Sequence, residues 1–325
     1  MTTMELDTAQ RAGRHGLTAG RRTMGPLDPA GVGITADGSP APATGRARPR
    51  PRPAWHAPEA LPSSLQVRPA ASTDEVAAAL RLVHDQYVAH GYMSRHPTGR
   101  RLSLQHALPS TRVFVAADAR RVVGTLTLIP DSPLRLPMDE IYGVELDGLR
   151  RQARAIAEVS AFALDPAYRA AGVAIIVRMV RLAIIAAEQA GVDDTCVAVN
   201  PHHVDFYLEF LRFSPLGERR DYRKVNGAPA VALRFDVGAA RHWIAMLSQG
   251  RTSLGLPHDF FFGPAHVAAG RAALRRDARR AEDPFDRFAR LFAGHDVLAS
   301  ATADELGAIL HGLARESRTR HVASA

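Results

Sequence analysis

Cysteine is nearly absent, because Cys196 is the only one among 325 residues. A single thiol cannot form an intramolecular disulfide or a zinc site that needs several thiolates, so a reducing compartment is expected. Long apolar runs are also lacking, since the best candidate, residues 172–190, is interrupted by Arg178 and Arg181. The N-terminus has no apolar core followed by a small-residue cleavage site, as a secretory signal would have. These absences predict a cytoplasmic protein that does not span a membrane.

Lysine is equally scarce, with Lys224 the single lysine among 41 basic residues. The formal net charge of +8 raises the question of nucleic-acid binding. The excess is +3 in residues 1–64, +2 in residues 65–237 and +3 in residues 238–325. Because no segment concentrates the basic charge, nucleic acid is not an expected partner.

Large aliphatic residues are few at the N-terminus. Residues 1–64 contain 9 Pro and 8 Gly but only 6 Leu, Ile, Val and Phe residues together. This composition cannot bury a core, so it predicts a disordered arm over residues 1–64, with a stiff polyproline-like run at residues 48–53. We interpret the arm as a solvated tail, and a basic arm that binds an acidic partner is the alternative.

From Leu65 onward, the hydrophobic pattern is typical of a mixed α/β domain over residues 65–237. A helix is expected from Thr73, the predicted capping residue, to about Ala89, and another from Gly172 to Ala190. The remaining expected elements are strands at residues 65–68, 112–116, 122–129, 156–164, 195–199, 215–222 and 230–236, a Pro-rich loop between 129 and 156, and a helix at 202–211. Residues 238–325 predict a helical C-terminal extension, with helices at 272–281 and 304–315.

Residues 169–174, Arg-Ala-Ala-Gly-Val-Ala, join a predicted strand to a predicted helix. Glycine and small side chains let backbone N–H groups approach an anion at a helix N-terminus, where unpaired donors and the helix dipole favour phosphate. The order strand, Arg-x-x-Gly-x-Ala, helix, strand resembles the pyrophosphate or pantetheine loop of GCN5-related acyltransferases. The candidates for donor binding are therefore Arg169, Gly172, Val173 and Ala174. The alternative is that Gly172 only eases entry into the helix.

Asn200 and Tyr207 follow the next predicted strand. Their placement, with Phe213 beyond them, resembles that of the Asn, Tyr and Phe around the thioester sulfur in acyltransferases of this fold. Tyr207 would protonate or hydrogen-bond the departing thiolate, since a phenol of pKa about 10 would face a thiol of pKa about 8.5. The alternative is a core tyrosine on an amphipathic helix.

Glu158 and Ser160 alternate along the predicted strand at residues 156–164, which places both side chains on one side of it. A carboxylate in an otherwise apolar strand is either satisfied by a partner or functional, because burying it unpaired is costly. Beside a thioester, Glu158 would orient an amine or accept its proton. The alternative is a structural carboxylate paired with an arginine.

Five segments together resemble the long-chain N-acyl amino acid synthase family, an acyl-carrier-protein-dependent branch of the fold related to acyl-homoserine-lactone synthases. They are residues 87–93, 108–111, 123–133, 157–160 and 199–207. The resemblance covers about residues 65–236 and implies a GCN5-related N-acyltransferase fold. It implies transfer of a fatty acyl group from acyl carrier protein to an amino acid or related small amine. It also implies that Tyr87 and Tyr92 line an acyl tunnel and that Arg101 pairs with an acceptor carboxylate.

Other chemistries have weaker support. Lactone production is not expected, because Ala161 stands where homoserine-lactone synthases carry an Arg after Glu-x-Ser. The 14 histidines show neither His-x-x-x-His nor His-x-x-Glu-His spacing, so no metal site and no cofactor beyond the thioester donor are expected. No Gly-x-Ser-x-Gly motif indicates a hydrolase. The open alternatives are a coenzyme-A-dependent small-molecule acetyltransferase and a non-catalytic acyl-carrier-binding regulatory module.

Overall fold

The computed structural model describes residues 61–119, 121–239, 261, 263–280 and 282–324. These ranges contain all the strands and helices described below. The predicted N-terminal arm, including the polyproline-like run, lies outside the described residues except for residues 61–64.

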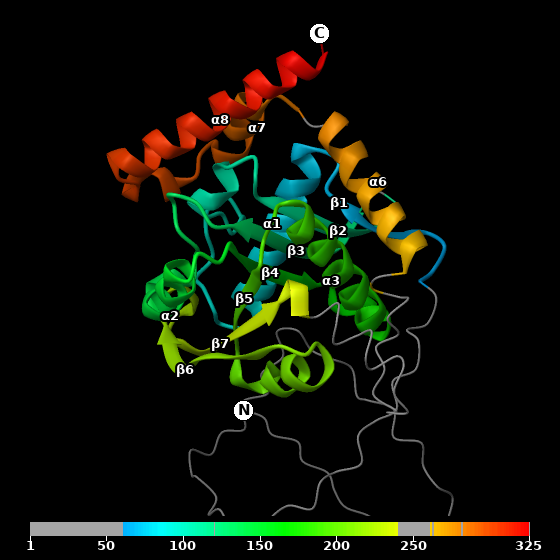
Figure 1. Cartoon of the computed structure of the whole chain (residues 1–325), viewed down its shortest axis with the longest axis vertical. Coiled ribbons are helices and arrows are strands. Elements are labelled where there is room, and N and C mark those ends of the chain that lie inside the picture. Colours follow the sequence, from blue (N-terminus) through cyan, green and yellow to red (C-terminus); the bar gives the residue numbers. More distant parts are fainter. Residues whose placement is uncertain (1–60, 120, 240–260, 262, 281, 325) are drawn as a thin grey trace, which may run out of the picture.

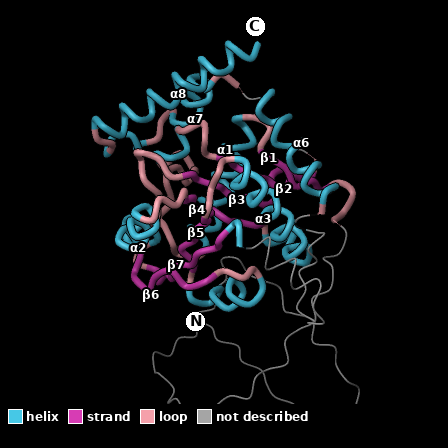
Figure 2. Tube along the Cα trace, in the orientation of Figure 1, coloured by secondary structure: helices cyan, strands magenta, loops and turns pink. Residues whose placement is uncertain are grey.

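A seven-stranded sheet forms the centre of the protein (Figures 1 and 2). Its strands are β1 (Leu65–Pro69), β2 (Arg112–Asp118), β3 (Arg121–Pro130), β4 (Ile156–Leu164), β5 (Asp194–Val199), β6 (Ser214–Tyr222) and β7 (Ala228–Asp236). The order across the sheet is β1-β2-β3-β4-β5-β7-β6, and every neighbouring pair is antiparallel except β4 with β5. All seven predicted strands are confirmed, with ends that differ from the prediction by at most two residues.

Two helices cover opposite faces of the sheet. On β2, Phe114 and Ala116 belong to the core cluster of α3 (Gly172–Gln189), whereas Val113 and Val115 belong to the cluster of α1 (Thr73–Ala89). This alternation is the period-two pattern of a strand buried on both sides. The β4-α3-β5 unit therefore forms as predicted, with α3 as the crossover between parallel strands.

Three local predictions need correction. Ser72, and not Thr73, caps α1, because its side chain accepts a hydrogen bond from the Glu75 N–H group. The predicted Pro-rich loop contains a helix, α2 (Asp139–Arg151), in which apolar residues at i, i+4 and i+7 are buried. The predicted helix at 202–211 is instead a 3-10 turn (Pro201–His203) followed by a π-helical segment (Phe206–Phe210).

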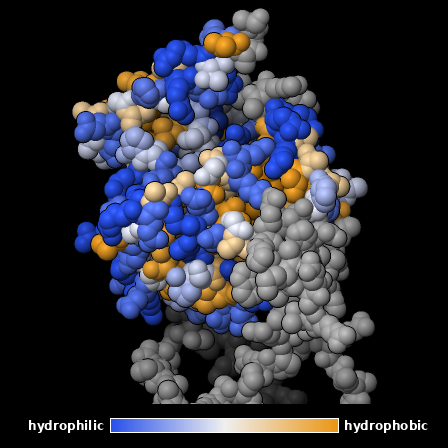
Figure 3. Space-filling view, viewed as in Figure 1, coloured by the Kyte–Doolittle hydropathy of each residue, from blue (hydrophilic) through white to orange (hydrophobic). Residues whose placement is uncertain are grey.

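The C-terminal helices are α6 (Pro264–Arg280), α7 (Pro284–Phe292) and α8 (Ala303–Ser324). Helix α6 packs on α3, while buried residues of α7 and α8 join the same apolar cluster as α1. Figure 1 shows α8 crossing one end of the molecule beside α7. The end of the molecule at α8 is mainly hydrophilic in Figure 3. Leu310 and Val322 are exposed apolar residues on this helix.

One described helix, residues 166–189, is long and apolar enough to cross a membrane. This segment contains α3, and 67% of its most apolar window is buried inside the protein. Most of the apolar residues of α3 pack against the sheet and α6, so the central core accounts for its composition.

Strands β4 and β5 separate after a short paired stretch. They pair only over three positions, of which Glu158 opposite Cys196 is the last. Beyond it, β4 carries an irregularity opposite Thr125 and Thr127 of β3, and Ala161 has a φ of 53°, in the left-handed region that disfavours residues with a Cβ. The bulge bends β4 away from β5 and opens the sheet.

Candidate active site

A cavity of about 200 Å³ occupies the opening between β4 and β5. Its wall is mostly apolar and comes from both strands, the end of α1, α3, β6, β7 and the π-helical segment. We call it the central cavity. Seven of the eleven residues predicted from the sequence line it: Tyr87, Tyr92, Arg101, Glu158, Ser160, Asn200 and Tyr207.

Glu158 lies at the last paired position of β4, where the strands begin to separate. Its side chain is buried, and its Oε2 atom accepts a hydrogen bond from the Met138 N–H group at 2.8 Å. Ser160 lines the same cavity and lowers the pKa of the Glu158 carboxyl. No ion pair among the described residues joins Glu158 to an arginine, so the predicted structural alternative is not what satisfies it.

The surroundings of Glu158 hold its proton more tightly than water does. Burial raises the pKa of this carboxyl to about 7, against the opposing effects of the Met138 hydrogen bond, of Ser160 and of the charge of Lys224. A carboxyl that titrates near neutral pH is suited to exchange a proton with a substrate amine.

Helix α2, which the sequence pattern did not predict, positions the Met138 N–H group. Met138 is the residue immediately before α2, and Arg150 near the end of α2 binds Asp131 and Asp139 at 2.7 Å each. Asp139 also accepts from the Leu136 N–H group at 2.8 Å. These contacts connect both ends of α2 to the loop before it. They thereby hold in place the Met138 N–H group, which donates a hydrogen bond to Glu158.

Tyr207 belongs to the π-helical segment on the other side of the central cavity. Its ring makes edge-to-face contacts with Phe206 and Phe213, with centroid distances of 5.8 and 5.2 Å. Burial raises the pKa of Tyr207 to about 12, and the nearby Tyr87 adds to the effect. The phenol therefore stays protonated and acts as a hydrogen-bond donor more readily than as a source of a free proton.

Asn200 directly follows β5 and caps the 3-10 turn that comes next. Its side-chain oxygen accepts a hydrogen bond from the His202 N–H group at 3.1 Å, which leaves the amide N–H₂ as the donor part of the side chain. Phe213 precedes β6 directly and packs on Phe235 with a centroid distance of 5.2 Å. Asn200 thus presents a polar edge beside an aromatic wall.

Arg101, Tyr87 and Tyr92 form a third side of the central cavity. The Arg101 guanidinium lies 4.5 Å from the centroid of the Tyr87 ring, and the two tyrosine rings meet edge to face at 5.7 Å. Among the described residues no carboxylate forms an ion pair with Arg101, whose side chain makes a long hydrogen bond of 3.4 Å to the Lys224 carbonyl. The positive charge faces a largely apolar space.

The four other predicted residues, Arg169, Gly172, Val173 and Ala174, do not line the central cavity. They lie at the N-terminus of α3, whose later turns supply Ile176 and Val180 to its wall. The Gly172 N–H group already donates to the Arg169 carbonyl, and a Cβ on Gly172 would stand 3.1 Å from Leu164. Gly172 has ordinary helical torsions, so its small size serves close packing of α3 on β4. Phosphate binding there stays a prediction.

Two groups in this site were missed by the sequence analysis. Tyr222 lines the central cavity and donates its hydroxyl proton to the Pro137 carbonyl at 2.8 Å, and burial raises its pKa. The Met138 N–H group comes from the unpredicted start of α2. The acidic pair Asp139 and Glu140 directly after Pro137 and Met138 was the available signal for a helix start.

A second, larger cavity of about 730 Å³ lies between α1, the β2 and β3 ends and the C-terminal helices. None of the eleven predicted site residues lines it. The candidate active site is therefore defined by chemistry at the central cavity and not by cavity size.

The family profile and the solved structures that resemble this chain indicate the same family. The profile of N-acyl amino acid synthase FeeM matches residues 78–236. The chain is similar to the structure of FeeM, an N-acyl amino acid synthase from uncultured soil microbes, with 30% identity over 56% of this chain and 98% of that chain (TM-score 0.48). It is also similar to BjaI, a CoA-dependent acyl-homoserine lactone synthase, with 19% identity over 64% and 100% of the two chains (TM-score 0.43).

A more distant similarity is to a putative N-acetyltransferase from Lactobacillus plantarum, with 16% identity over 54% of this chain and 99% of that chain (TM-score 0.37). A comparison with curated proteins gave no match.

The mixed sheet, the separation of β4 from β5 and the cavity inside it define a GCN5-related N-acyltransferase fold. Within this fold, the family profile and the 30% identity across nearly all of FeeM indicate the N-acyl amino acid synthases. The chain belongs to the N-acyl amino acid synthase FeeM family and is an N-acyltransferase.

Proposed function

We propose that this N-acyltransferase moves a fatty acyl group from the phosphopantetheine thioester of acyl carrier protein to the amine of an amino acid or related small amine, in the cytoplasm. The observation that supports it most is the presence of a buried carboxyl, Glu158, and a partly buried phenol, Tyr207, on the wall of one cavity. These groups suit the two proton-dependent events of aminolysis, attack by an amine and departure of a thiolate.

In the proposed reaction the acceptor nitrogen attacks the thioester carbonyl carbon. The carbon–nitrogen bond forms, the carbon–sulfur bond breaks, and Glu158 accepts the proton that the nitrogen releases. Tyr207 hydrogen-bonds the departing thiolate, which takes one proton from solvent to give the free thiol, while Glu158 returns the proton of the amine to solvent. Alignment of the two reactants supplies the larger part of the acceleration, roughly 7–11 kcal/mol, because each unit by which the pKa of the amine exceeds the pH costs only about 1.4 kcal/mol.

The apolar walls of the central cavity support an acyl group larger than acetyl. Leu126, Phe162 and Ile184 line it together with the aromatic residues described above. For the donor, the N-terminus of α3 with Arg169 supports binding of a phosphate, which both acyl carrier protein and coenzyme A contain. An acidic carrier protein would gain further from the positive side chains there, so it is the proposed donor, and acyl-coenzyme A is the alternative.

Arg101 supports an acceptor that bears a carboxylate. Its guanidinium has no carboxylate partner among the described residues and lies on the cavity wall, stacked on Tyr87, whose ring in turn meets Tyr92. A zwitterionic amino acid would give this charge a partner while its amine is directed to Glu158.

The proposal is tested with purified protein, one fatty acyl chain on either acyl carrier protein or coenzyme A, and an amino acid or its methyl ester. We expect an N-acyl amino acid by mass spectrometry, with the carrier protein as the better donor. The ester should be acylated with a kcat/KM at least about tenfold lower, because it loses a charge-assisted hydrogen bond worth roughly 1.5–3 kcal/mol. Equal use of both donors at every salt concentration would favour the coenzyme-A alternative, and absence of any amide product would favour the non-catalytic one.

The proposed roles predict the behaviour of two conservative variants. Glu158→Gln and Tyr207→Phe should each lower kcat by about 10²–10⁴ while the protein stays folded, because each removes one proton-handling group and keeps the shape of its side chain. Glu209→Gln is the matched control, since Glu209 is exposed on the same π-helical segment as Tyr207 and should keep wild-type turnover. Wild-type turnover in folded Glu158→Gln would contradict the assigned role.

A further inference from the structure

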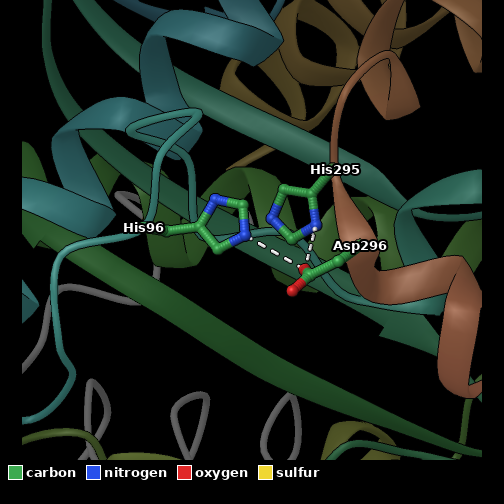
Figure 4. Close-up of side chains that lie close together, drawn as sticks. All are labelled: His96, His295 and Asp296. Carbon is green, nitrogen blue, oxygen red and sulfur yellow. Dashed lines mark hydrogen bonds and ion pairs between the residues drawn. The ribbon is translucent and has the colours of Figure 1, made fainter.

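Two histidines and an aspartate from distant parts of the chain meet outside the central cavity. His96 lies in the loop between α1 and the 3-10 helix Leu104–Ala107, whereas His295 and Asp296 lie between α7 and α8 (Figure 4). His96 is 200 residues from Asp296 in sequence, which is why histidine spacing predicted no metal site here. The imidazole rings stack at a centroid distance of 4.0 Å.

The potential ligand atoms have separations close to those of a metal-coordinating set. The His96 Nε2 atom lies 3.0 Å and the His295 Nδ1 atom 3.4 Å from the Asp296 Oδ1 atom, and all three atoms lie within 4.8 Å of one another. A tetrahedral ion with bonds of about 2.0–2.1 Å places its ligand atoms about 3.3–3.4 Å apart, so the two nitrogens need only a modest approach to bind one ion.

The other nitrogen of each ring already faces an oxygen. The His295 Nε2 atom lies 3.3 Å from the Arg100 carbonyl, and the His96 Nδ1 atom lies 2.7 Å from the Thr98 hydroxyl. Metal-binding histidines usually donate their second N–H group to such an oxygen, which fixes the tautomer and the ring orientation. With that N–H group on the second nitrogen, each ring would have its lone pair on the nitrogen that lies nearer Asp296.

Backbone hydrogen bonds compete with a metal ion at this cluster. The Val297 N–H group donates to His295 Nδ1 and the Thr98 N–H group to His96 Nδ1, each at 3.2 Å. Without a metal, His96 carries its proton on Nε2 and donates it to Asp296. Metal binding would move that proton to Nδ1, where the Thr98 hydroxyl accepts it, so the Thr98 N–H contact would be lost and the Val297 contact weakened.

We propose that His96, His295 and Asp296 bind a divalent transition-metal ion of the zinc type, with water at its remaining position. Two imidazoles and one carboxylate suit such ions, and Asp296 is 79% exposed, which leaves the ion a path to solvent. The ion would join the loop that leads to Arg101 to the segment between α7 and α8. One hydrogen bond already connects these two segments, because Arg100 Nη2 donates to the Ala293 carbonyl at 2.8 Å. We call this contact between the two segments the junction.

The test uses the full chain freed of metal by a chelator and titrated with zinc chloride in a calorimeter, with cobalt chloride as an absorbing substitute. We expect one zinc ion per chain and ligand-field absorption with cobalt. His96→Ala and Asp296→Asn should each weaken binding at least about 100-fold, since even outer partners of metal ligands change affinity about 10–100-fold. His311→Ala, an exposed histidine on α8, is the matched control and should bind zinc as the wild type does.

A second readout reports on the junction itself. Zinc should slow amide hydrogen exchange in residues 94–101 of the wild-type chain, and it should have no such effect in Asp296→Asn, whose exposed side chain can change without loss of the fold. No stoichiometric zinc binding by the wild type, or equal affinity in all three variants, would overturn the proposal. Neither result depends on acyl transfer, so the proposed function would be unaffected.

Discussion

Glu158 is a carboxyl group whose surroundings oppose its ionisation. Only 3% of the residue is exposed, and burial shifts its pKa from the ordinary 4.5 to about 7. Each pKa unit corresponds to about 1.4 kcal/mol of difference between the two protonation states. The folded protein therefore binds this proton more tightly than the unfolded chain does, and the stability that comes from the proton is lost as the pH rises from about 4.5 through 7.

This linkage predicts a pH-dependent effect of Glu158→Gln on stability. The neutral amide keeps the Met138 hydrogen bond but has no charge to bury, so its free energy of unfolding relative to the wild type should rise by about 2–3 kcal/mol between pH 5 and pH 8. Urea unfolding of both proteins at the two pH values measures it. A difference that does not change with pH would mean that the pKa of Glu158 is not raised.

Strand β6 packs on helix α2 at Gly217, where there is no space for a side chain. A Cβ on Gly217 would lie 2.8 and 2.9 Å from two ring atoms of Tyr142. That ring cannot move aside easily, because the Tyr142 hydroxyl shares its one proton between the carbonyls of Glu218 and Ala230. The contact holds β6 against the helix whose start supplies a hydrogen bond to Glu158.

Gly217→Ala should therefore lower the free energy of unfolding by about 1–3 kcal/mol, the usual cost of an overpacked contact. Gly307→Ala is the matched control, since Gly307 is exposed within α8 and nothing lies within 4 Å of its added Cβ. The control should gain about 0.5–1 kcal/mol from the better helix propensity of alanine. Thermal or urea unfolding measures both, and a neutral Gly217→Ala would show that α2 and β6 are not tightly packed.

At the scale of the elements, those that the sequence predicted well have strong local patterns. Strands β2 to β5 alternate or run continuously apolar because both faces of the sheet are covered, and α3 has a wide apolar face. Helix α2 was missed because few of its residues are apolar and because Pro133 and Pro137, which are typical of a loop, come shortly before it. The π-helical segment holding Tyr207 depends on contacts with Phe213 that propensity alone does not encode.

The candidate site was predictable to the extent that strand alternation and motif order determine it. Glu158 and Ser160 share a face by geometry, and Asn200 and Tyr207 lie beyond the end of the parallel strand beside them. The loop that brings Tyr92 and Arg101 to the same cavity closes through long-range packing, which no local pattern reports. The cluster of His96 with Asp296 likewise joins segments from opposite ends of the described chain.

At the scale of the whole molecule, the C-terminal helices share a core with the part of the chain that matches the family. Leu291 and Leu313 lie in one buried cluster with Leu80 of α1 and Val115 of β2. The family profile ends at residue 236, so α7 and α8 lie beyond it. A shared core of this kind makes separate unfolding of the extension costly, because it would expose the face of α1 that α7 and α8 cover.

This packing predicts that a destabilising substitution in α8 also lowers the stability of the sheet. Leu313→Ala removes a side chain that is 1% exposed and should lower the free energy of unfolding by about 2–5 kcal/mol. Native-state hydrogen exchange should show the same decrease in the free energy of unfolding at the most protected amides of α8 and of β2. Leu310→Ala, on the same helix but 56% exposed, should change the free energy of unfolding by no more than about 0.5 kcal/mol. If Leu313→Ala lowers protection in α7 and α8 while β2 keeps its own, the extension unfolds by itself, and the shared cluster contributes little to the stability of the acyltransferase part.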